Sequence, residues 1–315
     1  MCRKGKRGFN NIVTPTEEET ARKNSDTRVL TGFITGLIIF ASIYIGGYVF
    51  AFVVGVFVFF ALKEYVKILQ CKGFQPSFRI SFFVAFLLFL VSVAHRNDLF
   101  PLIIFLGVTL SFCAVLFKLR QPYIANVATT VFGFILCWLP THVYLIRGLG
   151  SPGKGFLTLC NHNEGLGFLV MMFFTILATD ICAFFVGRKF GKHKLSPEVS
   201  PKKTIEGAIG GSVAAILIAM FFGYVLGMTV WQSVLGGVLI TFFAQIGDLS
   251  ESLIKRDAGV KDSGNSLPGH GGFLDRADSY ILSAPIAYYF FKCIVMGDWT
   301  FLDTIQKALS NVGFM

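Results

Sequence analysis

The chain has 315 residues, of which 54% are hydrophobic and only 15% charged, and phenylalanine alone occurs 36 times. A soluble domain cannot bury so large an apolar fraction, so the composition excludes a soluble globular protein and indicates an integral membrane protein. The formal net charge of +10 does not by itself indicate nucleic-acid binding, because basic residues in a membrane protein usually report its topology. The seven cysteines form no CxxC motif and several lie in apolar runs, so they are interpreted as small hydrophobic residues.

Residues 1–28 form a polar segment of mixed charge ahead of the first apolar run. A segment of this composition cannot bury a core, so we expect a disordered cytoplasmic tail. The apolar run that follows starts too late and is too long for a cleaved signal peptide, and the three glutamates at 17–19 argue against a transit peptide.

Long uncharged runs dominate the rest of the chain, and each predicts a membrane helix. Crossing the hydrocarbon core takes about 20 apolar residues, and backbone polar groups there must be satisfied within a helix. The first run, residues 29–62, is too long for one span, so we divide it at Gly46 and Gly47 and expect the second helix to continue toward Leu69. The other runs lie at residues 80–94, 100–117, 127–146, 166–187, 208–226, 229–253 and 280–296. The sequence therefore predicts an all-α, polytopic bundle of about nine transmembrane helices.

Lysine and arginine alternate between well-populated and nearly empty connections along this series of spans. Positive residues collect in cytoplasmic loops, so the N-terminal tail is expected in the cytoplasm and the C-terminus on the opposite side.

Acidic residues in or beside the spans need an explanation, because carboxylates are costly in a membrane. Asp180 and Asp248 each lie late in a span that should end at the cytoplasm, and Asp275 and Asp278 come just before the last span. A basic segment at residues 187–211 joins two further cytoplasmic helix ends. These polar residues are therefore predicted to meet in a pocket that faces the cytoplasm.

The spacing of these residues supports a common site. Asp248, Ser252 and Lys255 are related by i, i+4 and i+7, which puts them on one face of a helix. Asp275 and Asp278 are three residues apart, again on one face.

The segment around Pro201 predicts an anion site at a helix start. Pro201 suits a first helical turn with Ser200 as its N-cap, which would direct backbone N–H groups, Lys202 and Lys203 toward an anion.

Glycines 269, 271 and 272 around His270 would let the backbone approach a ligand closely. Carboxylate oxygens can hold Mg²⁺ while lysine and arginine neutralise phosphate, so the parts together predict a phosphate-rich ligand bound with a divalent cation. Simpler readings stay open for single residues: Asp180 and Asp248 as structural ion-pair partners, and the basic loops as topology signals.

Residues 148–155, GLGSPGKG, nearly spell a phosphate-binding P-loop. Gly155 replaces the serine or threonine that would contact Mg²⁺, no strand precedes the segment, and the topology places it outside. We interpret it as an external loop.

A long motif with fixed spacing begins at Ser252. It reads SxxKR from Ser252, KD at 261–262, LPxHGG at 267–272 and DRxD at 275–278, and it closely resembles the signature of the CDP-diacylglycerol synthases, or phosphatidate cytidylyltransferases. Similar segments are TDxxAFFxGRxFGKHKL and SPKKTxEGxxGG from Thr179, and AQxGDLxES from Ala244. The motifs cover the second half of the chain, whereas the first half resembles the family only in its hydrophobicity. Departures from the pattern are Thr179, Phe184 and Ala277, none of which removes a charge.

The resemblance implies transfer of CMP from CTP to phosphatidic acid, giving CDP-diacylglycerol and pyrophosphate, with Mg²⁺ required. It implies metal ligation by Asp248 and Asp275 and leaves open a second, monovalent ion at the same site. Catalytic contacts are then expected at Lys255, Arg256, Lys261, Asp262, His270 and Arg276. Substrate contacts are expected at Asp180, Ser200, Lys202, Lys203, Thr204, Glu206, Ser252, Gly271, Gly272 and Asp278.

This reading divides the chain into the tail, N-terminal transmembrane helices at 29–165, and a catalytic transmembrane region at 166–315. The expected setting is a bacterial inner membrane, with no nucleic-acid partner and with a homodimer left open. Two other functions are weighed: a CTP-dependent lipid kinase, and an ion-coupled transporter using Asp180 and Asp248. The transporter is disfavoured because both acids lie near helix ends and no internal repeat is found.

Overall fold

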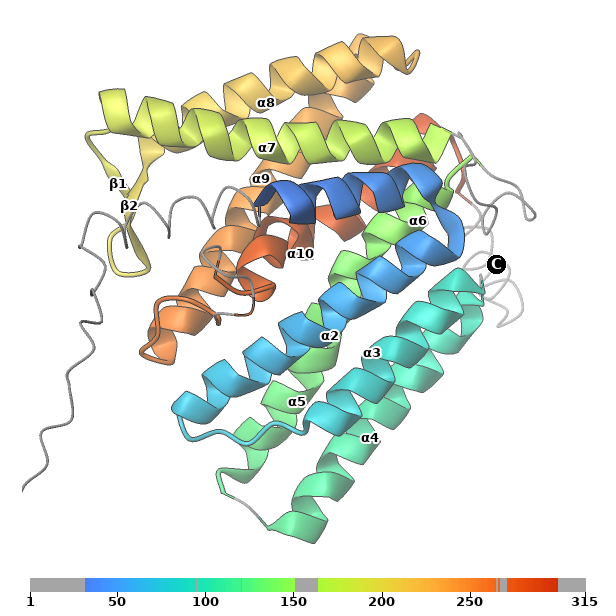
Figure 1. Cartoon of the computed structure of the whole chain (residues 1–315), viewed down its shortest axis with the longest axis vertical. Coiled ribbons are helices and arrows are strands. Elements are labelled where there is room, and N and C mark those ends of the chain that lie inside the picture. The colour runs from blue at the N-terminus through green and yellow to red at the C-terminus, as the bar shows by residue number, and fades with distance from the viewer. Residues whose placement is uncertain are drawn as a thin grey trace, which may run out of the picture.

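The structure is a computed structural model that describes residues 32–94, 96–119, 121–150, 164–264, 266 and 271–299. The predicted tail at residues 1–28 lies outside these ranges. The described residues are mainly helical, and the helices form a bundle whose two halves meet at α10 (Leu274–Tyr289), as Figure 1 shows.

The N-terminal half begins with the helix Gly32–Ile45, followed by α2 (Gly47–Cys71). The predicted break between them is confirmed: Gly46 has a φ of 70°, in the left-handed region that favours glycine. Arg147 closes this corner, because its Nε donates to the carbonyl oxygen of Ile43 at 2.8 Å. The half continues with α3 (Phe78–Val93), α4 (Phe100–Lys118) and α5 (Tyr123–Trp138), and a 3₁₀ turn at Leu139–Thr141 leads into α6 (His142–Gly148).

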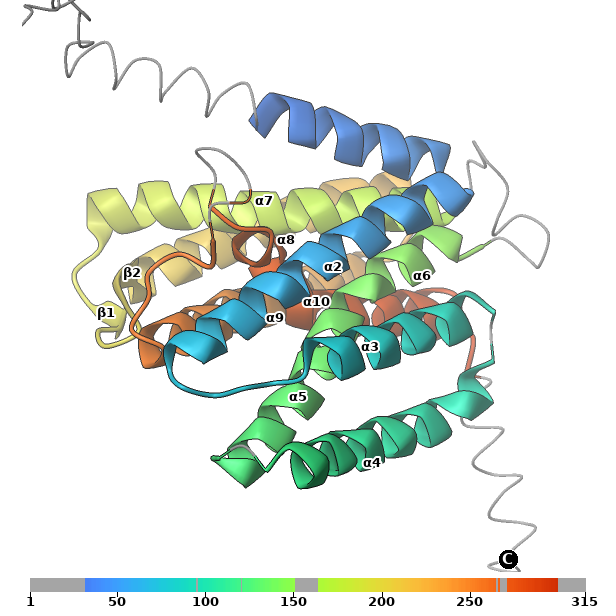
Figure 2. The same ribbon diagram turned by 60° about the horizontal axis from the view of Figure 1, so that its bottom comes forward.

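The C-terminal half consists of α7 (Glu164–Phe190), α8 (Ile205–Val225), α9 (Val230–Asp257) and α10, which continues as a π-helix at Phe290–Val295. In Figure 2, α7 and α8 lie side by side. Gly207 and Gly211 allow this, because a Cβ at either would approach the backbone of α7 within 2.7 Å. In lipid, where apolar side chains gain little from leaving the solvent, such small residues let helix backbones pack closely.

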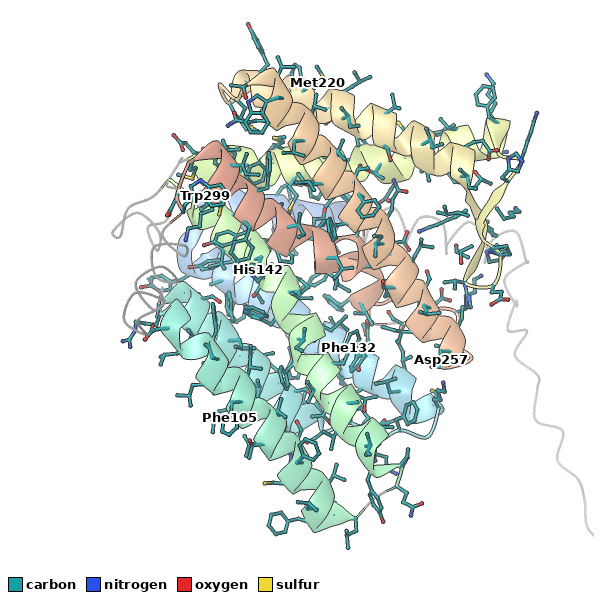
Figure 3. All side chains as sticks on the ribbon, turned by 180° about the vertical axis from the view of Figure 1, so that it is seen from behind. Phe105, Phe132, His142, Met220, Asp257 and Trp299 are labelled. Carbon is teal, nitrogen blue, oxygen red and sulfur yellow. The ribbon has the colours of Figure 1, made fainter. Side chains whose placement is uncertain are left out.

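Every predicted span contains a described helix. Among the described residues, six helices are long and apolar enough to cross a membrane, with the segment Tyr123–Gly148 counted as one, and Gly32–Ile45 and Phe78–Val93 are shorter apolar helices. Large apolar side chains also cover the outside: Phe105 on the outer face of α4 is 66% exposed (Figure 3). The chain is thus a multi-pass, all-α membrane protein in its described part, and the number of nine crossings stays a prediction.

The helix α10 joins the two halves. Leu274, Ala277 and Ile281 on one of its faces belong to the same buried cluster as Leu62 and Tyr65 of α2. The first turns of α10 and the loop before it carry the charged motif, so the packing of α10 determines where those charges lie.

One sequence prediction is wrong. Ser200 and Pro201 do not begin a helix: they lie in the strand β2 (Ser200–Thr204), which pairs antiparallel with β1 (Lys194–Ser196). The helix α8 begins after this hairpin, with Thr204 as its N-cap, whose hydroxyl accepts from the backbone N–H of Gly207 at 3.2 Å. A proline cannot donate to a strand ladder, but an isolated two-stranded ribbon has free edges on both sides and accommodates it.

Candidate active site

Four chain segments bring the predicted site residues to one end of the C-terminal half. They are the C-terminal end of α7, the hairpin β1–β2, the C-terminal end of α9 and the N-terminal end of α10 (Figure 1). Acids from three of these segments share one cavity. Asp180 of α7, Asp248 of α9 and Asp278 of α10 line one cavity of about 570 Å³, together with Asp275 and Arg276.

The same cavity has an apolar wall. Its other lining residues come from Gly32–Ile45, α2, the turn before α6, α6, α7 and α10, and include Ile39, Phe50, Val54 and Phe173. A cavity lined by both carboxylates and aliphatic and aromatic side chains suits a ligand that has a charged head and apolar chains.

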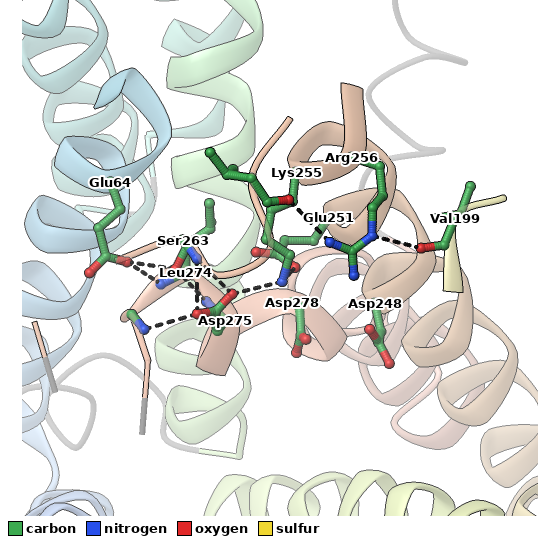
Figure 4. A network of polar contacts seen from close by, with 12 residues as sticks. Glu64, Val199, Asp248, Glu251, Lys255, Arg256, Ser263, Leu274, Asp275 and Asp278 are labelled. Carbon is green, nitrogen blue, oxygen red and sulfur yellow. Dashed lines mark hydrogen bonds and ion pairs between the residues drawn. The ribbon is translucent and has the colours of Figure 1, made fainter. Parts of the chain in front are cut away.

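Buried charges on α9 and α10 form a network beside this cavity. Lys255 pairs with Glu251 one turn earlier on α9, and its Nζ donates to Asp275 Oδ1 at 2.7 Å. The side chains of Glu251, Lys255 and Asp275 are only 1%, 11% and 13% exposed. Because isolated charges are strongly disfavoured at such sites, each of these groups depends on the others. Figure 4 shows Lys255 between the two acids.

The carboxylate of Asp275 is also held by the loop before α10. It accepts from the backbone N–H of Ser263 at 3.1 and 3.2 Å and from that of Gly272 at 2.9 Å. Gly271 has a φ of 82°, and a Cβ there would lie 2.7 Å from Asp275 Oδ2. Gly271 and Gly272 thus let the backbone surround the Asp275 carboxylate. The sequence had suggested that these glycines let the backbone approach a bound ligand.

Asp248 is paired with Lys203 of β2, so the hairpin reaches across to α9. Both side chains are partly exposed, at 24% and 30%. In Figure 4 the side chains of Asp248 and Asp278 project to the same side of their helices. Asp248, Ser252 and Lys255 all lie on α9, and Asp275 and Asp278 both lie on α10, while their predicted alignment on one face of each helix stays a prediction.

Arg256, a predicted catalytic contact, and Glu206, a predicted substrate contact, both form hydrogen bonds within the protein. Arg256 donates to the carbonyl oxygens of Val199 at 3.2 Å and Val260 at 3.1 Å, which ties the hairpin to the end of α9. Glu206 accepts from the backbone N–H of Lys192 at 3.1 Å and from Nδ1 of His193 at 2.6 Å, which closes the turn ahead of the hairpin.

The other predicted residues differ in their exposure. Lys202, Lys261, Asp262 and Arg276 are exposed at this end of the molecule, and Ser252 is half-buried on α9. His270 lies outside the described residues, as do residues 151–155 of the rejected P-loop segment 148–155.

Sequence reasoning missed Glu64. This residue lies on α2, is only 4% exposed, and accepts through Oε2 from Ser263 Oγ at 3.1 Å and from the backbone N–H of Leu274 at 2.9 Å. The available signal was a single acid in a helix expected to run on toward Leu69, which the high cost of intramembrane carboxylates should have singled out.

The acidic residues that line the cavity can be compared with the ligands that Mg²⁺ needs. Within the described residues, no group of three or more His, Cys, Asp or Glu side chains is arranged to hold a metal ion. Asp248 and Asp275 nevertheless line the same cavity, and Mg²⁺ is commonly bound by one or two carboxylates plus substrate phosphates. The donor set therefore fits a metal that arrives with a phosphate ligand, and not a metal held by the protein alone.

Comparison with known proteins covers both halves of the chain. A family model described as "Cytidylyltransferase family" matches residues 26–294. A phosphatidate cytidylyltransferase of Synechocystis sp. is 34% identical over 283 residues, which are 84% of this chain and 95% of that protein. Phosphatidate cytidylyltransferase 4, chloroplastic, of Arabidopsis thaliana is 32% identical over 311 residues, which are 92% of this chain and 79% of that protein. The N-terminal half, likened to the family on hydrophobicity alone, thus falls within the matches.

Proposed function

Because the chain belongs to the cytidylyltransferase family, we propose that it is a phosphatidate cytidylyltransferase, which transfers CMP from CTP to phosphatidic acid and releases pyrophosphate. The observation that carries this proposal is the cavity of about 570 Å³, which is lined by Asp180, Asp248, Asp275 and Asp278 together with many apolar side chains. A phospholipid headgroup and a nucleotide phosphate can meet at the carboxylates, with acyl chains along the apolar side chains.

The reaction needs positioning and charge neutralisation more than acid–base chemistry. A phosphate oxygen of phosphatidic acid, already anionic near neutral pH, attacks the α-phosphorus of CTP, and the bond from that phosphorus to the bridging oxygen of pyrophosphate breaks. No covalent enzyme intermediate is required, so aligned phosphates and nearby cations supply most of the catalysis.

The cations for this step are proposed to be Arg276, which lines the cavity, and lysines of the hairpin, α9 and the loop before α10. Lys203 and Lys255 are now paired with Asp248 and Asp275, and an incoming phosphate would compete for them. Lys202, Lys261 and Arg276, which are exposed, are proposed to bind the outer phosphates, which leave as pyrophosphate.

Asp248 and Asp275 are proposed to hold Mg²⁺ together with the phosphates of CTP. Bound there, the ion would neutralise charge on the reacting phosphates. Asp248→Asn and Asp275→Asn should each lower activity by at least about a hundredfold, since each removes an anionic oxygen ligand. Full activity of both variants with unchanged Mg²⁺ dependence would contradict the assignment. A second, monovalent ion is tested by comparing activity in potassium, sodium and choline buffers.

The proposed location is a bacterial inner membrane, with the tail and the carboxylates of the cavity at the cytoplasm. This orientation rests on the positive residues near these carboxylates in the sequence. Single cysteines placed on either side test it with a membrane-impermeant thiol reagent, and labelling of both termini from one side would reject the topology. Crosslinking in native membranes tests the proposed homodimer.

The direct test is an assay of the purified protein with phosphatidic acid and with CTP, dCTP, ATP or UTP. A cytidylyltransferase forms CDP-diacylglycerol and pyrophosphate in the presence of Mg²⁺. A CTP-dependent lipid kinase, the alternative, would instead release CDP and phosphorylate a lipid alcohol. Comparison of the four nucleotides measures the base selectivity at the same time.

A further inference from the structure

Glu64 connects the N-terminal half to the loop that carries the charged motif. Its carboxylate extends from α2 to Ser263 and to the first backbone N–H of α10, as Figure 4 shows. The contact spans 199 residues of sequence to Ser263 and 210 to Leu274. In the part of the chain that the structure describes, these hydrogen bonds connect α2 to the motif.

Glu64 and Asp275 hold the same two pieces of backbone from opposite sides. Ser263 donates its hydroxyl to Glu64 and its backbone N–H to Asp275, and its hydroxyl also accepts from the backbone N–H of Asp275 at 3.3 Å. Glu64 further binds the N–H of Leu274, the residue next to Asp275. A movement of Glu64 would therefore displace the groups that orient the Asp275 carboxylate.

The local packing is built for this carboxylate. A Cβ at Gly264 would lie 3.0 Å from Glu64 Oε1, and a Cβ at Gly272 would overlap both Glu64 Oε2 and Ser263 Oγ. Glycine at 272 thus leaves the room that Glu64 occupies, and a side chain at 264 would make a tight contact with it. Negative charge at the first turn of α10 is also favourable, because helix N-termini carry unsatisfied N–H groups and partial positive charge.

We propose that Glu64 is a positioning residue for the cytidylyl transfer, which holds the 263–264 and 272–275 segments so that Asp275 faces the cavity. This inference rests on the proposed function. Glu64 itself does not line the cavity, so it acts through Ser263 and the start of α10. Catalysis of this kind is sensitive to small displacements, since a shift of about 1 Å can cost roughly a hundredfold in rate.

If Glu64 served only to hold the fold together, its loss would unfold the bundle. The helix α10 is also anchored in the N-terminal half by Leu274, Ala277 and Ile281, so the fold does not depend on Glu64 alone. Loss of Glu64 should therefore release the loop while leaving the bundle folded.

The experiment compares Glu64→Ala, Glu64→Gln and Ser263→Ala with Tyr65→Phe in detergent with added phosphatidic acid. Tyr65 is the matched control, because it is the next residue of α2, is 1% exposed, and donates to the carbonyl oxygen of Thr129, away from the loop. Glu64→Ala and Ser263→Ala should lower kcat by about tenfold to a hundredfold with KM for CTP within about threefold. Glu64→Gln, which keeps an acceptor oxygen, should recover at least about a third of the wild-type kcat, and Tyr65→Phe should leave kcat unchanged.

A second readout does not depend on activity. Lys261 is exposed in the loop, so limited trypsin digestion followed by mass spectrometry measures how often the loop opens. Cleavage after Lys261 should become at least about fivefold faster in Glu64→Ala, with unchanged cleavage in Tyr65→Phe. If Glu64→Ala does not fold, Ser263→Ala carries both measurements.

The inference is overturned if kcat of the Glu64→Ala and Ser263→Ala proteins stays within threefold of wild type, if cleavage at Lys261 is unchanged, or if Glu64→Gln is no better than Glu64→Ala. A wild-type protein that forms no CDP-diacylglycerol would reject the proposed function instead. The cleavage comparison would still decide whether Glu64 holds the loop.

Discussion

Replacing Lys255 by methionine should destabilise the protein strongly. The substitution keeps the length of the side chain but removes the charge that neutralises Glu251 and Asp275. At the 2.7 Å distance between Lys255 Nζ and Asp275 Oδ1, the attraction is ~6 kcal/mol with an effective dielectric constant of ~20. Part of this is offset by the cost of desolvating the three groups, and loss of one partner of a buried pair typically costs about 3–5 kcal/mol. We expect Lys255→Met to lower the free energy of unfolding by that amount.

The assay is denaturant unfolding in detergent micelles, with two comparisons. Lys72→Met removes an ion pair with Asp257 whose side chains are 35% and 57% exposed, so it should cost less than about 1 kcal/mol. The double variant Lys255→Met with Glu251→Gln removes one of the two stranded charges, so it should be more stable than Lys255→Met alone. A loss for Lys255→Met no larger than that for Lys72→Met, or a double variant that is less stable than the single one, would refute the idea of mutually dependent buried charges.

Three further outcomes follow from the geometry of the site. Gly272→Ala should lower the free energy of unfolding by about 2 kcal/mol or more because its Cβ would overlap Ser263 and Glu64, whereas Gly55→Ala, which has nothing within 4 Å, should have no such cost in the same assay. Arg256→Lys should lower kcat by roughly tenfold, because it removes the hydrogen bond that holds the hairpin at Val199. Arg256 is exposed, so the free energy of unfolding should change by less than about 1 kcal/mol. An unchanged kcat would show that this hydrogen bond is dispensable. Removal of divalent cations with EDTA should abolish CDP-diacylglycerol formation and added Mg²⁺ should restore it, and turnover that persists in excess chelator would contradict the metal proposal.

The sequence alone was sufficient for the fold class and for the expectation that acids of several helices share one cavity. In a membrane, a long uncharged run has few options besides a helix, and the break at Gly46 was visible because the run is too long and contains two glycines. The placement of Asp180, Asp248 and Asp278 near one cavity followed from counting spans, since helices that end on the same side bring their ends together. The motif from Ser252 to Asp278 indicated the family because its charged residues have a fixed spacing.

The tertiary structure decided which group contacts which. Ser200 and Pro201 have good helix-start chemistry, yet pairing with β1 places them in a strand, and pairing of this kind depends on a partner segment that local propensity does not reveal. Arg256 resembles a phosphate ligand in the motif, but it binds the carbonyl oxygens of Val199 and Val260. Glu64 lies in an N-terminal helix without motif residues, and its role became visible only when α2 packed against the start of α10. Local rules fix helices and their ends, whereas contacts between segments far apart in the chain depend on how those helices pack together.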